Sequence, residues 1–130
     1  MEKARVLVTG FPAFAGGEHN ISQQIVTELN RIGSSEVVVA SPPRVHLDGR
    51  PEQDDMIRTV VVEWQTDVLA CDREGADRTA ARLSASDWQA VLHLGLCDSC
   101  KVPRLERVAS NELRMRVSDN SGRRIVDGII

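Results

Sequence analysis

Few residues of this 130-residue chain could perform nucleophilic or acid–base chemistry. A thiol nucleophile needs a neighbouring base, most often an imidazole, that favours the thiolate. The candidates are three cysteines and three histidines: Cys71, Cys97, Cys100, His19, His46 and His93. His93 lies inside an apolar stretch and is expected to be a core residue. None of the six is a convincing nucleophile or base on sequence grounds.

The segment Cys97-Asp98-Ser99-Cys100 has CxxC spacing, which suggests either a redox pair or a zinc site. One CxxC is only half a zinc site. A thioredoxin-like motif also needs its first cysteine at a helix N-terminus, where the helix dipole favours the thiolate. The residues after Cys100 do not begin an obvious helix. We therefore expect both cysteines to be ordinary reduced thiols that hold no metal.

An irregular loop near the N-terminus carries two of the four aromatic residues of the chain, Phe11 and Phe14. The loop has neither GxGxxG nor GxxxxGK[ST], so no phosphate-binding motif is present. The two rings offer apolar faces, which suit a small and largely apolar ligand. The alternative is that both rings only close the end of the core. Asn20, later in the loop, is expected to tie down its backbone.

Positioning this loop requires a strand before it and a helix after it. Val6-Leu7-Val8 is a continuous apolar run, typical of a buried strand that ends at Thr9-Gly10. A helix is expected to begin near Ser22, whose hydroxyl can cap it, and to end at Gly33. A strand–loop–helix unit places the loop at the carboxyl end of a parallel sheet, where α/β folds build their sites.

The remaining elements alternate along one domain, expected over residues 1–130. The helix that ends at Gly33 should present an apolar stripe of Ile25, Val26, Leu29 and Ile32. Further strands are expected at 36–40, 57–69, 89–94 and 105–109, a helix at 73–83 and a loop at 41–55. The strands at 36–40 and 89–94 should be buried. This order predicts an α/β fold with a mostly parallel sheet flanked by helices.

Composition excludes several classes of function. The chain is 42% hydrophobic and 27% charged, with a net charge of -3, so it has no basic surface for nucleic acid. No apolar run reaches the roughly 20 residues of a membrane span, and no signal-peptide core is present. Three cysteines without a paired framework favour a reducing, cytoplasmic location.

Three blocks of sequence resemble the pyroglutamyl peptidase I (pyrrolidone-carboxylate peptidase) family. The first runs from Thr9-Gly10-Phe11 through Phe14, Gly16 and Asn20 to Ser22, like the signature TGFxxFGGxxxNPS. It departs from that signature at 12–13, 15 and 21. The second block, 94–96 followed by 105–111, is similar to LGL…VERVAVN. The third, 119–122 followed by 125–128, is similar to DNxG and IVEGG.

The resemblance implies a three-layer α/β/α fold of the phosphorylase/hydrolase-like type, incomplete at the C-terminus, and a cysteine peptidase that removes N-terminal pyroglutamate from peptides. Phe11 and Phe14 would line the pocket for the pyroglutamyl ring, and Asn20 would support it. Glu106 would orient the catalytic imidazole, although a strand Glu paired with Arg104 or Arg107 is the plainer interpretation. No cofactor or metal is implied.

The catalytic Cys and His of the family have no counterpart among these residues. Three interpretations remain open. The chain is a truncated N-terminal portion of a peptidase, or one half of a split enzyme whose partner chain supplies Cys and His. Alternatively, it is a non-catalytic relative that keeps the pocket for binding or assembly.

Overall fold

The computed structural model describes residues 1–14, 16–40 and 57–129. The loop expected at 41–55, which includes His46, lies outside these residues.

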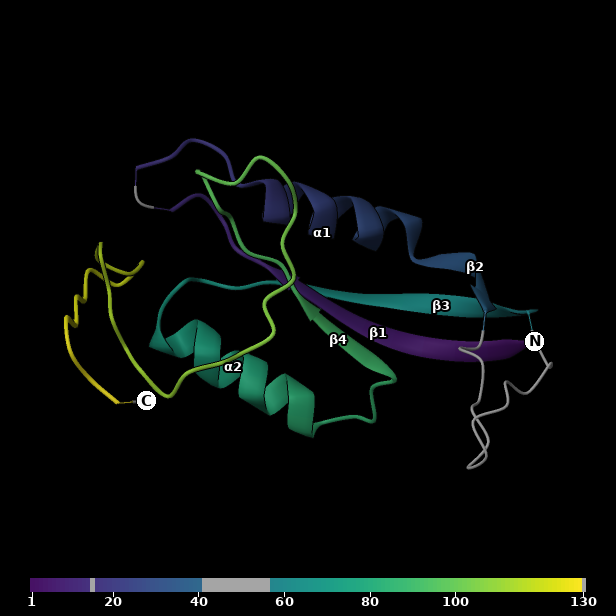
Figure 1. Cartoon of the computed structure of the whole chain (residues 1–130). Helices are drawn as coiled ribbons and strands as arrows, with labels where there is room; N and C mark the ends of the chain where they lie inside the picture. The colour runs from purple at the N-terminus through teal and green to yellow at the C-terminus, as the bar shows by residue number, and fades with distance from the viewer. Residues whose placement is uncertain (15, 41–56, 130) are drawn as a thin grey trace, which may run out of the picture.

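A four-stranded sheet forms the centre of the fold (Figure 1). β1 (Glu2–Gly10) pairs in parallel with β3 (Ile57–Val68) on one side and with β4 (Ala90–His93) on the other. β2 (Ser34–Ala40) pairs antiparallel with β3, which gives the strand order β2-β3-β1-β4. The prediction of a mostly parallel sheet is therefore confirmed.

The core is built on the second half of β1. Leu7 and Val8 are both 0% exposed, and Thr9 and Gly10 are also buried. A central parallel strand is covered on both faces, which is why this stretch is a continuous apolar run rather than an alternating one. The predicted strand at 6–8 is correct, although it begins earlier.

Two helices cover opposite faces of the sheet, α1 (Ile21–Ile32) and α2 (Arg73–Ser84) (Figure 1). Successive side chains of β3 reach one helix each, as the pleat of a strand requires. Thr66 donates a hydrogen bond from its hydroxyl to Asn30 of α1 at 3.1 Å, and Asp67 pairs with Arg78 of α2. The predicted ends of both helices lie within one or two residues of the observed ends.

The packing of α1 differs from the predicted stripe. Val26 is 2% exposed, whereas Ile25 and Ile32 are 41% and 43% exposed. The helix ends as predicted at Gly33, whose φ is 73° and whose N–H bonds the Leu29 carbonyl at 2.9 Å. α1 therefore packs on β1 and β3 through a narrower set of apolar side chains than the predicted stripe.

The two outer strands are not buried as predicted. Residues of β2 alternate between exposed and half-buried, and all four residues of β4 are exposed. Both strands have a single hydrogen-bonded neighbour in the described sheet, β3 and β1 respectively. Apolar composition alone does not bury a strand at the edge of a sheet.

The strand predicted at 105–109 is absent from the structure. This segment runs without regular structure, and Leu105 and Val108 are 84% and 81% exposed. A strand requires the backbone of a neighbour to complete its hydrogen bonds, and in the described chain the sheet ends at β4. The alternating pattern of this segment has no partner to pair with.

The last part of the described chain, 94–129, contains neither helix nor strand. It folds back on itself through backbone hydrogen bonds of 2.7–2.8 Å between Leu113 and Gly128, Met115 and Ile125, and Asp119 and Arg123. Among the described residues, no helix has the length and apolar character needed to cross a membrane.

Candidate functional site

The loop at 11–20 leaves the sheet at the carboxyl end of β1, as predicted. Two backbone hydrogen bonds of 2.9 Å fix its origin, from Leu69 to the Gly10 carbonyl and from Leu94 to the Thr9 carbonyl. The segments that follow β3 and β4 therefore begin beside the loop that follows β1. Three connections meet at one edge of the sheet.

Gly10 lets α1 approach this edge. A Cβ placed on Gly10 would lie 2.7 Å from the Ser22 carbonyl oxygen and 2.9 Å from Cγ2 of Val26. Because the first contact is with backbone, no side-chain rotation could relieve it. The glycine is therefore needed for the first turn of α1 to pack on the end of β1.

Asn20 and Ser22 hold the loop against the helix. Asn20 is the N-cap of α1, since its Oδ1 accepts the Ser22 N–H at 3.0 Å. That oxygen also accepts the Ser22 hydroxyl at 2.7 Å, and Asn20 Nδ2 donates to the Pro12 carbonyl at 3.1 Å. Ser22 Oγ in turn accepts the N–H of Phe11 at 3.0 Å. Ser22 was predicted to cap the helix, but its hydroxyl instead anchors the loop.

Asn20 therefore has the backbone-binding role expected for it. Asn20 and Ser22 are 4% and 1% exposed, and their hydrogen-bonding groups serve the loop and the helix. Phe11 and Phe14 are half-buried. Neither residue is sealed into the core or fully exposed to solvent, and this burial is compatible with both predicted roles of the two phenylalanines.

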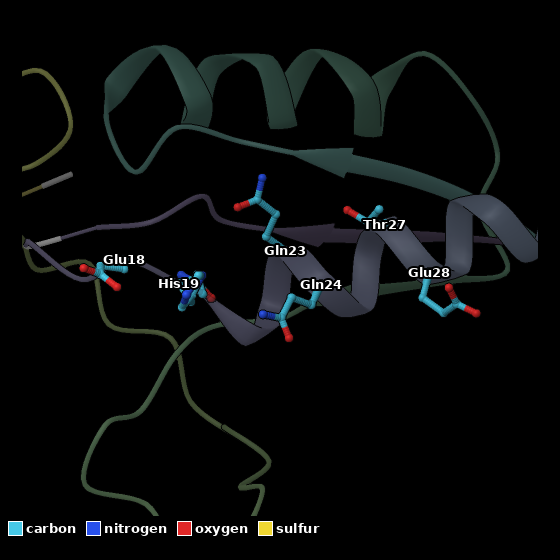
Figure 2. A pocket seen from close by; sticks show the side chains of 7 residues that line it. Glu18, His19, Gln23, Gln24, Thr27 and Glu28 are labelled. Atoms are coloured by element: carbon cyan, nitrogen blue, oxygen red, sulfur yellow. The ribbon is translucent and has the colours of Figure 1, made fainter.

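A shallow depression lies beside this loop, on the first turns of α1 (Figure 2). It has a volume of about 350 Å³. Its lining residues are Glu18, His19, Asn20, Gln23, Gln24, Thr27 and Glu28. These side chains are polar, and neither Phe11 nor Phe14 is among them. The depression is thus distinct from the apolar slot predicted for a lactam ring.

Glu106 lies in the irregular segment after β4. Its carboxylate is 3.7 Å from Nη2 of Arg104, and its side chain is 82% exposed. The structure therefore shows the ion pair with Arg104 that the plainer interpretation predicted. In the part of the chain that the structure describes, Glu106 contacts no imidazole. It remains accessible to one.

A polar row crosses the sheet one residue before this edge. Thr9 of β1 is in register with both Asp67 of β3 and His93 of β4. Thr9 Oγ1 and His93 Nδ1 share a hydrogen bond of 2.7 Å, and Thr9 is 2% exposed. His93 itself is exposed, so its predicted place in the core is wrong. His93 is exposed although its sequence neighbours are apolar, because β4 is an outer strand of the sheet.

Asp67 completes this row, and it was not among the candidate site residues predicted from the sequence. It is 9% exposed, and one carboxylate oxygen pairs with Arg78 of α2. The other oxygen has no hydrogen-bond partner among the described residues. The available signal was positional, because Thr9 and Asp67 are each the penultimate residue of a strand and His93 is the last residue of its strand.

The third sequence block has a structural function. Asp119 Oδ1 accepts the N–H groups of Ser121 and Arg123 at 3.0 and 2.8 Å, closing a turn in which Gly122 has φ 79°. The backbone N–H of Asn120 donates to the Cys71 carbonyl at 3.0 Å, and Asn120 Oδ1 accepts the Cys71 N–H at 2.6 Å. This turn therefore docks the C-terminal segment onto the start of α2.

Within 1–14, 16–40 and 57–129, no cysteine forms a thiol–imidazole pair. Cys97 and Cys100 are joined by a disulfide, so the prediction of two reduced thiols is wrong. A turn with a Cys100 N–H to Cys97 carbonyl hydrogen bond of 3.1 Å brings their Cα atoms to 5.3 Å, within the usual range for a disulfide. Burial, with the nearby carboxylates of Asp119 and Asp72, raises the pKa of the Cys71 thiol. Cys71 is thus a poor nucleophile.

No group of three or more His, Cys, Asp or Glu side chains suited to a metal ion occurs among the residues described.

Comparison with known proteins places the fold. No protein-family model and no curated protein matches the chain. A pyrrolidone carboxyl peptidase from Fervidobacterium islandicum is 25% identical with a TM-score of 0.69, covering 97% of this chain and 49% of its own. One from Thermus thermophilus is 31% identical with a TM-score of 0.62, covering 95% and 51%.

A third such peptidase, from Thermococcus litoralis, is 23% identical with a TM-score of 0.65 and supports the fold alone. The chain spans about half the length of these solved structures. Their likeness confirms the α/β fold and the family resemblance expected from the sequence.

Proposed function

We propose that this chain, which has the fold of the pyrrolidone carboxyl peptidases and resembles them in its signature residues, serves the removal of N-terminal pyroglutamate from peptides. The observation that carries the proposal is the loop at 11–20. Its Phe, Gly and Asn positions match the signature of the family. The Ser22 hydroxyl accepts the N–H of Phe11 and the Asn20 amide donates to the Pro12 carbonyl, which fixes the loop at the carboxyl end of β1.

Phe11 and Phe14 are proposed to bind the pyroglutamyl ring. A five-membered lactam has apolar methylene edges, one N–H donor and one carbonyl acceptor, so it suits an apolar slot with a few fixed polar groups. Both residues are half-buried, so neither is sealed into the core. The N–H of Phe11 is held by Ser22, so the backbone beneath its ring is fixed before a ligand binds.

Glu106 is proposed as the positioning carboxylate for a catalytic imidazole. In a Cys–His pair the thiolate attacks the carbonyl carbon of the pyroglutamyl residue itself, and the C–N bond to the next residue breaks as its amine leaves with a proton from the imidazolium. Water then hydrolyses the pyroglutamyl thioester and regenerates the thiol. A carboxylate beside the imidazole favours the productive tautomer and the imidazolium. Glu106 is exposed, and its one ion pair among the described residues is 3.7 Å long, so an incoming imidazole could replace Arg104 at little cost.

The Cys and His are proposed to come from a segment outside these 130 residues, either on a second chain or in a longer protein. Cys71 is disfavoured by its raised pKa, and the other two cysteines are bonded to each other. We therefore propose that the 130-residue chain is inactive alone. A cytoplasmic location belongs to the same proposal and rests only on the cysteine count.

A non-catalytic binding or assembly protein is the second candidate. It is favoured by the histidine that lies at the site edge, since His93 Nδ1 bonds Thr9 and not a cysteine. Such a protein would keep the ring pocket and use it to hold peptides with N-terminal pyroglutamate. The two candidates share a ligand and differ only in turnover.

The test is the release of a chromophore from a pyroglutamyl amide. The chain alone should give background rates. Addition of the unmatched half of the Thermus thermophilus enzyme should restore turnover, and Glu106→Ala should abolish most of that gain. Glu112→Ala removes a similarly exposed carboxylate, which pairs with Arg114 at 3.7 Å, and should have no effect.

Turnover by the purified chain alone that is stopped by an alkylating agent would contradict the proposal and make a cysteine of this chain the nucleophile. Calorimetric binding of the amide without restored turnover would favour the binding protein.

A further inference from the structure

The Cys97–Cys100 pair lies in the segment that follows β4 at the site edge of the sheet. Leu94, which begins this segment, is bonded to the Thr9 carbonyl just before Gly10 and Phe11. Cys97 is exposed and Cys100 is half-buried, so a small thiol in solution can reach the disulfide. Disulfides that are exposed to solvent are typically the exchangeable ones.

The surroundings of the two sulfurs are unequal. Arg104 Nη2 lies 3.9 Å from Cys97 Sγ, and the Ser99 hydroxyl lies 3.7 Å from the same atom. A guanidinium and a hydroxyl beside a sulfur both stabilise a thiolate over a thiol. The described residues place no comparable group at Cys100 Sγ. Cys97 is therefore the sulfur better suited to ionise after the bond opens.

The same guanidinium also faces the predicted positioning residue. Arg104 Nη2 is 3.7 Å from Glu106 Oε1. Arg104 is thus shared between the disulfide and Glu106. A thiolate at Cys97 would compete with the carboxylate for one cation.

We propose that Cys97 and Cys100 form a reversible dithiol–disulfide site, in which Cys97 is the reactive cysteine because Arg104 stabilises its thiolate. This proposal does not rest on the peptidase function, since it concerns only the two sulfurs and the arginine beside them.

The chemistry requires an external thiol. A dithiol reductant is oxidised to its own disulfide and passes two electrons and two protons to the pair. The Cys97–Cys100 bond breaks, and two thiols form. In the reverse direction, the Cys97 thiolate attacks oxidised glutathione and releases glutathione thiolate. Cys100 then attacks the mixed disulfide and releases the second glutathione.

The first test counts thiols in the whole 130-residue chain by alkylation under denaturing conditions and mass spectrometry. After incubation with oxidised glutathione, one cysteine should be alkylated, Cys71. After dithiothreitol, three should be alkylated. Returning the protein to oxidised glutathione should restore the count of one, with no glutathione retained. Three free thiols in oxidised glutathione, or separate glutathione adducts on Cys97 and Cys100, would overturn the proposal.

The second test measures alkylation rates of the reduced protein at pH 7. Cys97 should react faster than Cys100, and Arg104→Gln should slow Cys97 about fivefold, the scale of one charge acting about 4 Å away through water. Arg107→Gln is the matched control, because Arg107 is exposed and has no ion pair within the described residues. Equal rates for the two cysteines, or equal effects of the two substitutions, would contradict the role given to Arg104.

Discussion

Asn20 illustrates how one amide can serve a helix and a loop together. Its oxygen caps α1 through Ser22, and its nitrogen holds the Pro12 carbonyl. Because the side chain is 4% exposed, these groups could not turn to water if one partner were lost. Asn20 therefore couples the position of the Phe11 loop to the start of the helix.

Asn20→Ala should destabilise the protein by about 1–2 kcal/mol, since it removes the cap and leaves the Pro12 carbonyl without its donor. Urea unfolding monitored by circular dichroism measures the change. Asn20→Ser keeps a capping oxygen and removes the amide donor without adding a charge, so it should cost less than the Ala variant. Equal stability of the Ala variant and the parent would show that the cap contributes nothing.

The contribution of each phenylalanine ring to ligand binding can be tested separately. If a pyroglutamyl amide binds, Phe11→Ala or Phe14→Ala should weaken binding by on the order of 1–3 kcal/mol, the value of a large buried apolar contact. Calorimetry measures the affinity, and circular dichroism checks that the fold persists. Unchanged affinity in both variants would assign the rings to structure alone.

At the scale of elements, the close contact between β1 and α1 depends on the absence of a Cβ at Gly10. Gly10→Ala would place a Cβ 2.7 Å from the Ser22 carbonyl oxygen, so α1 must move away from the strand. We expect a loss of about 1–3 kcal/mol in the free energy of unfolding, as for other overpacked sites. Gly95→Ala is the control, because its Cβ would meet nothing within 4 Å. Similar losses in both variants would refute the packing argument.

The stability of the N-terminal end of α2 should depend on pH. The Gly75 N–H and then the Ser121 hydroxyl hold the pKa of the Asp72 carboxyl below its usual range. A carboxyl with a lowered pKa in the folded state stabilises the fold above its unfolded pKa of about 3.9, and this contribution is lost as pH falls through the folded value. The cap and the docked 119–122 turn should therefore weaken on acidification below about pH 4.

Unfolding free energies of Asp72→Asn and the parent, measured from pH 7 down to pH 3, test this effect. The variant should lose less stability across the acid range. Asp87→Asn removes an exposed carboxylate with no hydrogen bond among the described residues and should follow the parent. If the Asp72→Asn curve also follows the parent, Asp72 makes no pH-dependent contribution.

The elements predicted correctly are those whose signals are local. An apolar run identified β1, a valine-rich run identified β3, a cap and a stop glycine identified α1, and apolar residues at helical spacing identified α2. The segment at 105–109 failed because a strand depends on a neighbour that lies elsewhere in the chain. The capping residue was misassigned because Asn20 and Ser22 are both good caps, and only the hydrogen bonds separate them.

The candidate site was predictable only in part. Phe11 and Phe14 were identified from the aromatic residues of one loop, and the resemblance to a family added the ring pocket and the role of Glu106. The row of Thr9 with Asp67 and His93 depends on strand register, which the sequence of one strand cannot specify. The disulfide likewise depends on the turn that closes between Cys97 and Cys100.

At the scale of the whole molecule, stability should decrease from the centre of the sheet outward. β1 has strands on both sides and contains the residues that are 0% exposed, whereas β4 pairs only with β1 and all its residues are exposed. Local opening requires least energy where few apolar contacts must break. The outer strand next to the candidate site is therefore expected to open before the centre.

Amide hydrogen exchange followed by NMR tests this gradient. In the chain alone, the amides of β4 should exchange much faster than those at 6–10 of β1. β2 is the internal control, because it is also an outer strand with one neighbour. Addition of the unmatched half of the Thermus thermophilus enzyme should slow exchange in β4 if that half packs against it, and should leave β2 unchanged. Protection of β4 equal to that of β1 in the chain alone would contradict the gradient, because an outer strand with exposed side chains has too few contacts to resist opening.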